Sequence, residues 1–110
     1  MKCTGTVTEL HPLMSLSECS FELKNVVVLK DSIDIEWYEE ETYGLLLSSI
    51  DAHSTMYTGP LTVKERPTVR GFYTAYRWNT VNKGILLLAT WKFDGNEGVC
   101  MFDLEKFKSE

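Results

Sequence analysis

The sequence predicts an all-β fold: a small antiparallel meander of seven or eight strands curled into a barrel or barrel-like sheet, with at most one or two short helices. Apolar and polar residues alternate with a period of two, as in Ile33, Ile35 and Trp37, which is the pattern of a strand with one buried face. Runs of β-branched and aromatic residues are separated by turn-forming residues about every ten positions. With 110 residues, the chain has the length of one domain, residues 1–110.

The strand signals follow one another along the chain. The first clear strand begins with alternation and continues as an unbroken apolar run from Val26 to Leu29. Asn25 between these two parts indicates either a bulge or the start of a strand with both faces buried. In chain order, the segments with strand signals are 21–29, 33–38, 45–47, 69–78, 85–93 and 99–107.

Glycine, asparagine and proline mark the connections between these strands. Segments 94–98 and 79–84 each lie between two β-rich runs and are typical of hairpin turns, and 30–32 is a further polar break. Pro60 and Pro67 interrupt the middle of the chain, and a proline in a strand indicates an edge or a bulge.

Two segments fit the β pattern less well. In 39–51, Tyr43, Leu46, Leu47 and Ile50 have helical spacing, yet the run from 44 to 47 equally suits a buried strand after a turn. We favour the strand, because the segments on both sides are expected to be strands. Residues 11–19 are the best candidate for a short helix.

Three runs carry large apolar groups on both faces of their strands, namely 26–29, 45–47 and 85–89. The outer face of a simple small barrel should be polar, so something is expected to cover these groups. We expect that cover to be another copy of the chain, in a homo-oligomer (a dimer or higher), and the alternative is a sandwich-like curl in which the chain covers itself.

Composition and motifs exclude several classes of function. Eleven Lys and Arg against sixteen Asp and Glu give a net charge of −5, which argues against nucleic acid and membrane surfaces as partners. No apolar run approaches a membrane span, which needs about 20 residues, and none has the form of a signal peptide. Cys3, Cys19 and Cys100 are widely spaced, without Cys-x-x-Cys, so we expect a cytoplasmic protein with reduced thiols and no metal site.

Catalytic motifs are also absent from the sequence. No glycine-rich phosphate loop occurs, so no cofactor is expected. Asp51 and His53 would share one side of a strand as an acid–base pair, but Ser54 would face away from them and leave the pair without a nucleophile. We therefore expect a protein that is not an enzyme, and an enzyme using this pair is the least favoured hypothesis.

The density of aromatic residues leads to our first functional hypothesis, a non-catalytic protein that binds a small apolar or aromatic molecule inside the barrel. The alternative is that the aromatic rings simply fill the core. The segment 89–93, followed by a hairpin and Cys100, resembles a strand pair of the avidin-type biotin-binding barrels over under a fifth of the chain. The early glycine–tryptophan strand of that family has no match here, and no residue role is transferred. The expected ligand-binding residues are Trp37, Tyr57, Tyr76, Arg77, Trp78 and Trp91.

The distribution of charge leads to the alternative hypothesis. Segment 31–51 contains seven acids and no base, whereas 64–92 contains six bases and one acid. An acidic face could mask a basic site on a partner protein, as an inhibitor or immunity-type protein does. Alternatively, cross-strand pairs between the two segments neutralise each other. The residues expected to bind the partner are Glu36, Glu39, Glu40 and Glu41.

Overall fold

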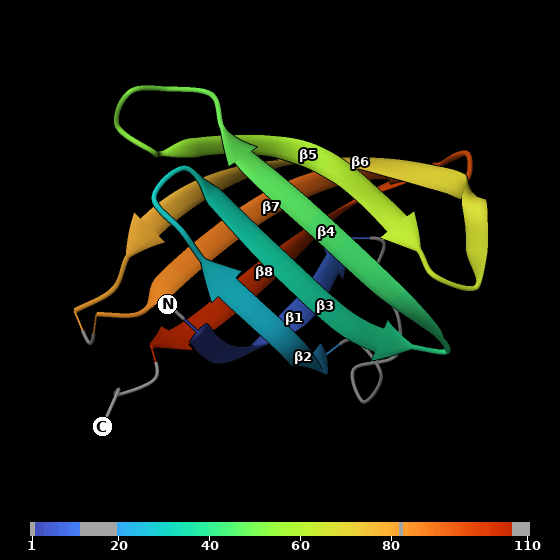
Figure 1. Ribbon diagram of the computed structural model, residues 1–110, viewed down its shortest axis with the longest axis horizontal. Helices are drawn as coiled ribbons and strands as arrows, with labels where there is room; N and C mark the ends of the chain where they lie inside the picture. The colour runs from blue at the N-terminus through green and yellow to red at the C-terminus, as the bar shows by residue number, and fades with distance from the viewer. Residues whose placement is uncertain (1, 12–19, 82, 107–110) are drawn as a thin grey trace.

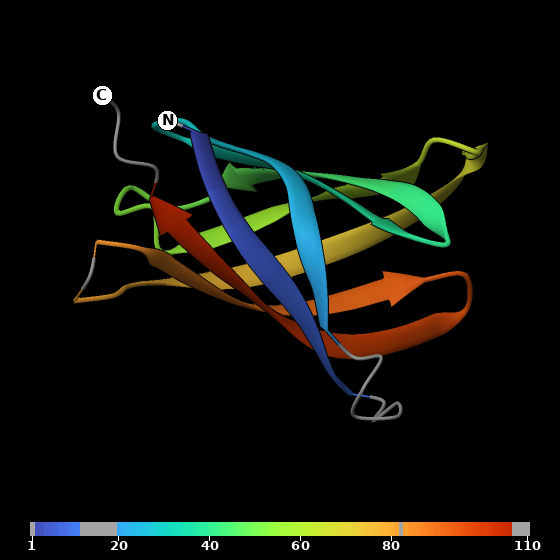
Figure 2. The ribbon, with the colours of Figure 1, turned by 90° about the horizontal axis from the view of Figure 1, so that it is seen from below.

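A computed structural model describes residues 2–11, 20–81 and 83–106, and these residues form a closed antiparallel barrel (Figure 1). Each strand pairs with the next one along the chain, and β1 also pairs with β8, which closes the sheet (Figure 2). The described residues contain no helix, and therefore none that could span a membrane. The strands are β1 (Lys2–His11), β2 (Ser20–Val28), β3 (Ser32–Glu39), β4 (Glu41–Ser49), β5 (Met56–Val63), β6 (Arg66–Asn79), β7 (Ile85–Phe93) and β8 (Asn96–Lys106).

The prediction of an all-β barrel is confirmed, and segment 39–51 is resolved in favour of the strand. There β4 pairs with β3 along its whole length, and Glu40 makes the turn between them with a φ of 64°. Within β4, Leu45 and Leu47 are fully buried and Leu46 is exposed, which is the alternation of a strand. His11 ends β1, and the remainder of the proposed helix, residues 12–19, lies outside the described residues.

Two shifts in strand register lie near Asn25 and Pro67, where the sequence predicts a bulge or an edge. The register between β2 and β3 shifts between Leu23 and Asn25, which confirms the bulge. The register between β5 and β6 shifts close to Pro67, where Thr62 pairs with Arg70 but Val63 pairs with Arg66. A closed barrel leaves no edge for Pro60. This residue pairs with Phe72 of β6 and faces a gap in the register between β4 and β5.

The interior of the barrel is a packed apolar core. Among the residues whose burial is described, the buried positions hold no polar or charged residue apart from tyrosine, and they recur at every second residue along the strands. Each fully buried leucine or isoleucine contributes roughly 1.5–3 kcal/mol relative to an exposed one. The largest fully buried side chains are Tyr57, Phe102, Ile33, Ile35, Leu45, Leu47, Leu61, Leu87, Leu104, Val7, Val63 and Cys100.

The outer face of the barrel keeps several large apolar side chains in contact with solvent. Leu46 is 48% exposed and Leu88 is 37% exposed, so no second layer made of described residues covers them, contrary to the sandwich-like alternative. Tyr76 pairs with Leu88, and Trp78 pairs with Leu86, so that these groups lie together across β6 and β7. The expectation that another copy of the chain covers such groups stays a prediction.

Gly59 allows β5 to approach β4 closely, and this gives a test of the fold. A Cβ atom at Gly59 would overlap the carbonyl oxygen of Leu46, whereas one at Gly44 would meet only the Thr62 hydroxyl, at 3.2 Å. We expect Gly59→Ala to lower the free energy of unfolding by about 1–3 kcal/mol, the typical cost of overpacking, and Gly44→Ala to lower it much less. Chemical denaturation of both variants measures this difference. Equal midpoints would show that β4 and β5 are not this close.

Candidate functional site

One end of the barrel contains a pocket of about 200 Å³. This is the end at which the β3–β4, β5–β6 and β7–β8 turns lie (Figure 1). A cavity of roughly 150 Å³ is large enough to bind benzene, so a small organic molecule fits the pocket. Its lining residues are Glu9, Trp37, Glu39, Tyr43, Leu61, Tyr73, Trp91 and Phe93.

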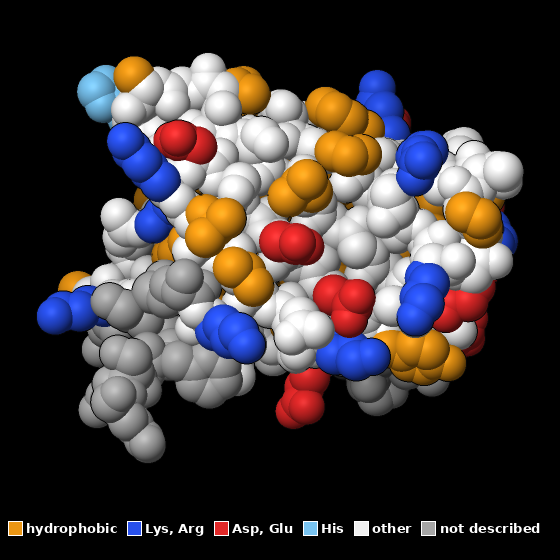
Figure 3. Space-filling model, in the orientation of Figure 1, with side chains coloured by type: hydrophobic (Ala, Val, Ile, Leu, Met, Phe, Trp, Pro, Cys, Tyr) orange, Lys and Arg blue, Asp and Glu red, His pale blue; other side chains and the backbone are white. Residues whose placement is uncertain are grey.

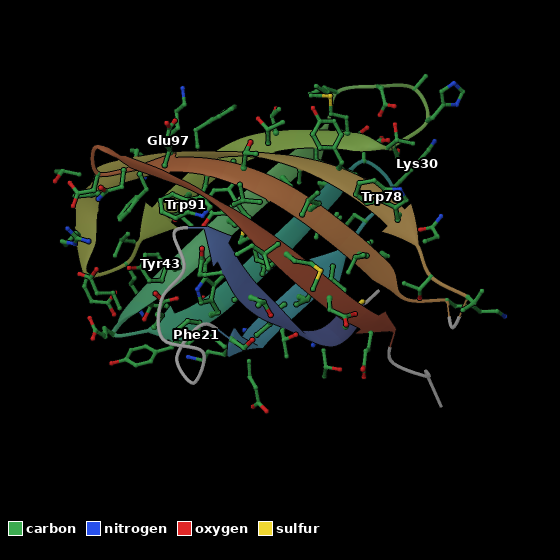
Figure 4. All side chains as sticks on the ribbon, turned by 180° about the vertical axis from the view of Figure 1, so that it is seen from behind. Phe21, Lys30, Tyr43, Trp78, Trp91 and Glu97 are labelled. Atoms are coloured by element: carbon green, nitrogen blue, oxygen red, sulfur yellow. The ribbon has the colours of Figure 1, made fainter. Side chains whose placement is uncertain are left out.

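Strand alternation explains why these side chains share the pocket. Along β1 the inward positions lead from Val7 to Glu9, and along β3 they lead from Ile35 through Trp37 to Glu39. In both strands, the inward side chains are aliphatic in the core and become aromatic or acidic toward the end of the strand that faces the pocket. Figure 4 shows Tyr43 and Trp91 at this same end of the barrel.

Aromatic rings form most of the pocket wall and the floor beneath it. Trp37 stacks on Tyr43 with ring centres 5.5 Å apart, and it meets Phe102 of the core edge-on at 5.6 Å. Tyr43 also meets Phe93 edge-on at 6.1 Å. Such contacts each add about 0.5–1.5 kcal/mol beyond the burial of area. The wall is therefore held in place before any ligand arrives.

Glu9 is the most perturbed carboxyl group of the pocket. Its pKa is raised to about 7 as the net result of three effects: burial raises it most, the hydrogen bond from Trp91 lowers it, and the charge of Glu39 raises it. That hydrogen bond runs from Nε1 of Trp91 to Oε2 of Glu9 over 3.1 Å. Glu9 thus changes its charge close to neutral pH.

Glu39 and Trp37 form the second polar part of the pocket. Burial raises the pKa of Glu39, the charge of Glu40 raises it further, and the indole N–H of Trp37 lowers it. Trp37 is 2% exposed, and its Nε1 atom has no hydrogen-bond partner. This N–H is close enough to Glu39 to lower the pKa of that carboxyl group, but it does not reach hydrogen-bond geometry. A buried donor without a partner costs about 1–3 kcal/mol.

The guanidinium group of Arg66 is held at the rim of the pocket, beside Phe93. It donates to Glu41 Oε2 over 2.7 Å and lies 3.8 Å from the Asp94 carboxylate. Its Cζ atom is 5.7 Å from the centre of the Phe93 ring. No lysine or arginine is among the described residues that line the pocket, so its ionisable groups are acidic or phenolic.

The six expected ligand-binding residues separate into three places. Trp37 and Trp91 line the pocket. Tyr57 and Arg77 lie toward the opposite end. There the Arg77 guanidinium donates a hydrogen bond of 2.9 Å to the hydroxyl oxygen of Tyr57, whose side chain is fully buried. The side chains of Tyr76 and Trp78 point outward and are 45% and 52% exposed, and Figure 4 shows Trp78 far from Trp91.

The four acidic residues expected to bind a partner do not share one environment. Glu39 lines the pocket, Glu40 is exposed at a turn, Glu41 pairs with Arg66, and Glu36 lies 4.0 Å from Lys24. Figure 3 shows acidic and basic side chains interspersed on the face that β3 and β4 cross. The pair between Glu41 and Arg66 joins the acidic segment to the basic one, but it is not a pair between sheet neighbours, since β5 lies between β4 and β6.

Asp51 has a structural role at the opposite end of the barrel. Its carboxylate accepts hydrogen bonds from the backbone N–H groups of Thr55, at 2.9 Å, and Met56, at 3.3 Å, and from the Thr55 hydroxyl. These bonds hold the loop between β4 and β5, and the contacts with Thr55 lower the pKa of Asp51. His53 is exposed on that loop. The expectation that the protein is not an enzyme stays a prediction.

Sequence reasoning missed Glu9, Tyr43, Leu61, Tyr73 and Phe93 as pocket residues. A signal existed for two of them, since Glu9 follows Val7 and Phe93 follows Trp91 at a spacing of two on the same strand face. A larger hollow of about 570 Å³ lies outside the barrel over β6, β7 and β8, and exposed Lys92 and Glu97 are among its lining residues. Two aromatic side chains, Phe72 and Trp91, line this hollow, and Trp91 lines the end pocket as well, whereas five aromatic side chains line the end pocket.

Comparisons with known proteins find no matching family model, no matching curated protein and no matching solved structure.

The raised pKa of Glu9 predicts how stability changes with pH. Because the folded chain holds this proton up to about pH 7 and the unfolded chain only up to about 4.5, stability falls as pH rises through that interval. We expect Glu9→Gln to flatten this fall, and Glu105→Gln, an exposed change on β8, to leave it unaltered. Denaturant titrations from pH 4 to 8 measure the slopes. A Glu9→Gln slope equal to that of the unaltered protein contradicts the prediction.

Proposed function

We propose that this protein is a non-catalytic binding protein that holds a small, largely apolar or aromatic molecule in the pocket at the end of its barrel. The observation that carries the proposal is the aromatic enclosure of the pocket. Among the described residues, three of the four contacts between aromatic rings involve Trp37 or Tyr43, and both of these rings line the pocket. Small-molecule sites are concave and mostly apolar, with a few polar groups that orient the ligand.

The acidic groups of the pocket support a binding role over a purely structural one. A half-buried carboxyl group costs stability, and a barrel selected for stability alone would place an apolar side chain at Glu9 and at Glu39. Carboxyl groups with perturbed pKa values in a hollow are typical of functional sites. The buried indole N–H of Trp37, which has no hydrogen-bond partner, is a further sign that the site is incomplete without a ligand.

The acidic interaction module has weaker support. Of the residues expected to bind a partner, Glu41 is already paired with Arg66 and Glu39 faces the pocket. Self-association draws support from a different observation, the exposed apolar side chains of Phe72, Tyr76 and Trp78 on the outside of β6.

Native mass spectrometry of the protein purified from its expression host is the first test. We expect a mass excess that disappears on denaturation, because a captured molecule stays in the pocket under gentle conditions. The measured mass also identifies the ligand and reports the oligomeric state. A chain mass without excess, both before and after incubation with a library of small aromatic compounds, contradicts the proposed function.

A pair of tyrosine variants locates the bound molecule. Tyr43→Ala removes a wall of the end pocket, and Tyr76→Ala removes a side chain of the same size from the outer face of β6. We expect Tyr43→Ala to weaken binding about tenfold or more and Tyr76→Ala to leave it unchanged, as measured by isothermal titration calorimetry. The reverse result would place the ligand on the outside of β6.

A further inference from the structure

The ionisable groups of the end pocket select for charge. Glu9 of β1 and Glu39 of β3 line the same pocket. The two carboxyl groups are close enough for the charge of Glu39 to raise the pKa of Glu9. The Arg66 guanidinium is occupied outside the pocket by Glu41 and Asp94. An anion entering this space would meet two carboxyl groups and, among the described lining residues, no compensating base.

A second and independent observation indicates that a ligand completes the site. The Trp37 side chain is almost fully buried, lines the pocket, and has an indole N–H without a hydrogen-bond partner. The effect of this N–H on Glu39 places it beside the carboxyl group. A positive charge held next to Glu39 favours its ionised form, which is the stronger acceptor for this N–H.

The aromatic walls suit the same kind of ligand. The faces of tryptophan and tyrosine rings attract cations, and a positively charged nitrogen can therefore contact the acids and the rings together. Trp37, Tyr43 and Trp91 surround the space near the two carboxyl groups. The volume of about 200 Å³ limits the ligand to one ring or a short chain beside its charged group.

We infer that the end pocket binds a small organic cation, an amine or quaternary ammonium group on a compact apolar body, with the charged nitrogen between Glu9 and Glu39 and the apolar part against Trp37, Tyr43 and Trp91. This inference rests on the proposed function and specifies its class of ligand.

Three probes of similar shape test the inference: 2-phenylethylamine, the neutral 2-phenylethanol and the anionic 3-phenylpropionate. By calorimetric titration at pH 8, we expect the amine to bind about tenfold or more tightly than the alcohol, and the carboxylate to bind more weakly than either. Equal binding of amine and alcohol, or tighter binding of the carboxylate, overturns the inference but leaves the proposed function in place. If none of the three binds and native mass spectrometry finds no captured molecule, both fail.

Isosteric variants separate charge from shape. We expect Glu9→Gln and Glu39→Gln each to weaken binding of the amine about tenfold, with binding of the alcohol unchanged. Glu97→Gln, which removes an exposed acid outside the pocket, is the matched control. Thermal melts verify that the variants fold, and alcohol binding verifies that their pockets remain intact. Loss of alcohol and amine binding in equal proportion would assign the two acids a merely structural role.

Proton exchange provides a readout that does not depend on a variant. Around Glu9 stand the titratable groups of Glu39, Tyr73 and Cys100, and burial raises the pKa of both the Tyr73 phenol and the Cys100 thiol. Among these, Glu9 gives up its proton near pH 7. Binding of the amine at pH 6 should therefore release protons, detected by calorimetry in buffers of different ionisation enthalpy, and affinity should rise toward pH 8. An affinity that falls over this interval contradicts the inference.

Discussion

The pairing of β1 with β8 is the constraint on which the rest of this structure depends. It joins the two ends of the chain from Cys3 with Lys106 to His11 with Val99, so every strand of the barrel has two neighbours. Gly5 allows the close approach, since a Cβ atom there would overlap the carbonyl oxygen of Asp103. Closure also limits the interior to the space that inward side chains can fill.

Within that closed space, the side chains separate into two zones. Aliphatic residues such as Ile35, Leu47 and Leu87 fill the barrel, and aromatic residues and two acids surround the hollow at one end. The zones meet at Phe102, which contacts both Trp37 and Tyr73. A rigid core thus supports the aromatic wall from below, and the half-buried carboxyl groups retain access to the pocket rather than being sealed in the core.

On the outer surface, an ion pair connects the acidic and the basic segments of the chain. Strand β5 separates the acidic strands β3 and β4 from the basic strands β6 and β7. Arg66 nevertheless joins the two segments through Glu41, and its guanidinium also packs over Phe93. The same contacts hold the Arg66 guanidinium at the rim, and it is not among the described residues that line the pocket. The selectivity for charge that we propose for the pocket therefore depends on the same contacts that neutralise charges at the surface.

The sequence by itself determined six of the eight strands, the turns at 30–32, 79–84 and 94–98, and the bulge at Asn25, because alternation and turn chemistry are local properties of the chain. It gave no recognised strand signal for β1 or β5. It also identified Trp37 and Trp91 as ligand candidates. Only the tertiary structure decided which side of the aromatic strand β6 lies inside, since Tyr73 and Tyr76 occupy opposite faces and both faces carry aromatic rings. Only the tertiary structure also showed that Glu9 belongs to the site, because its partner Trp91 is 82 positions away and the pairing of β1 with β8 brings the two side chains together.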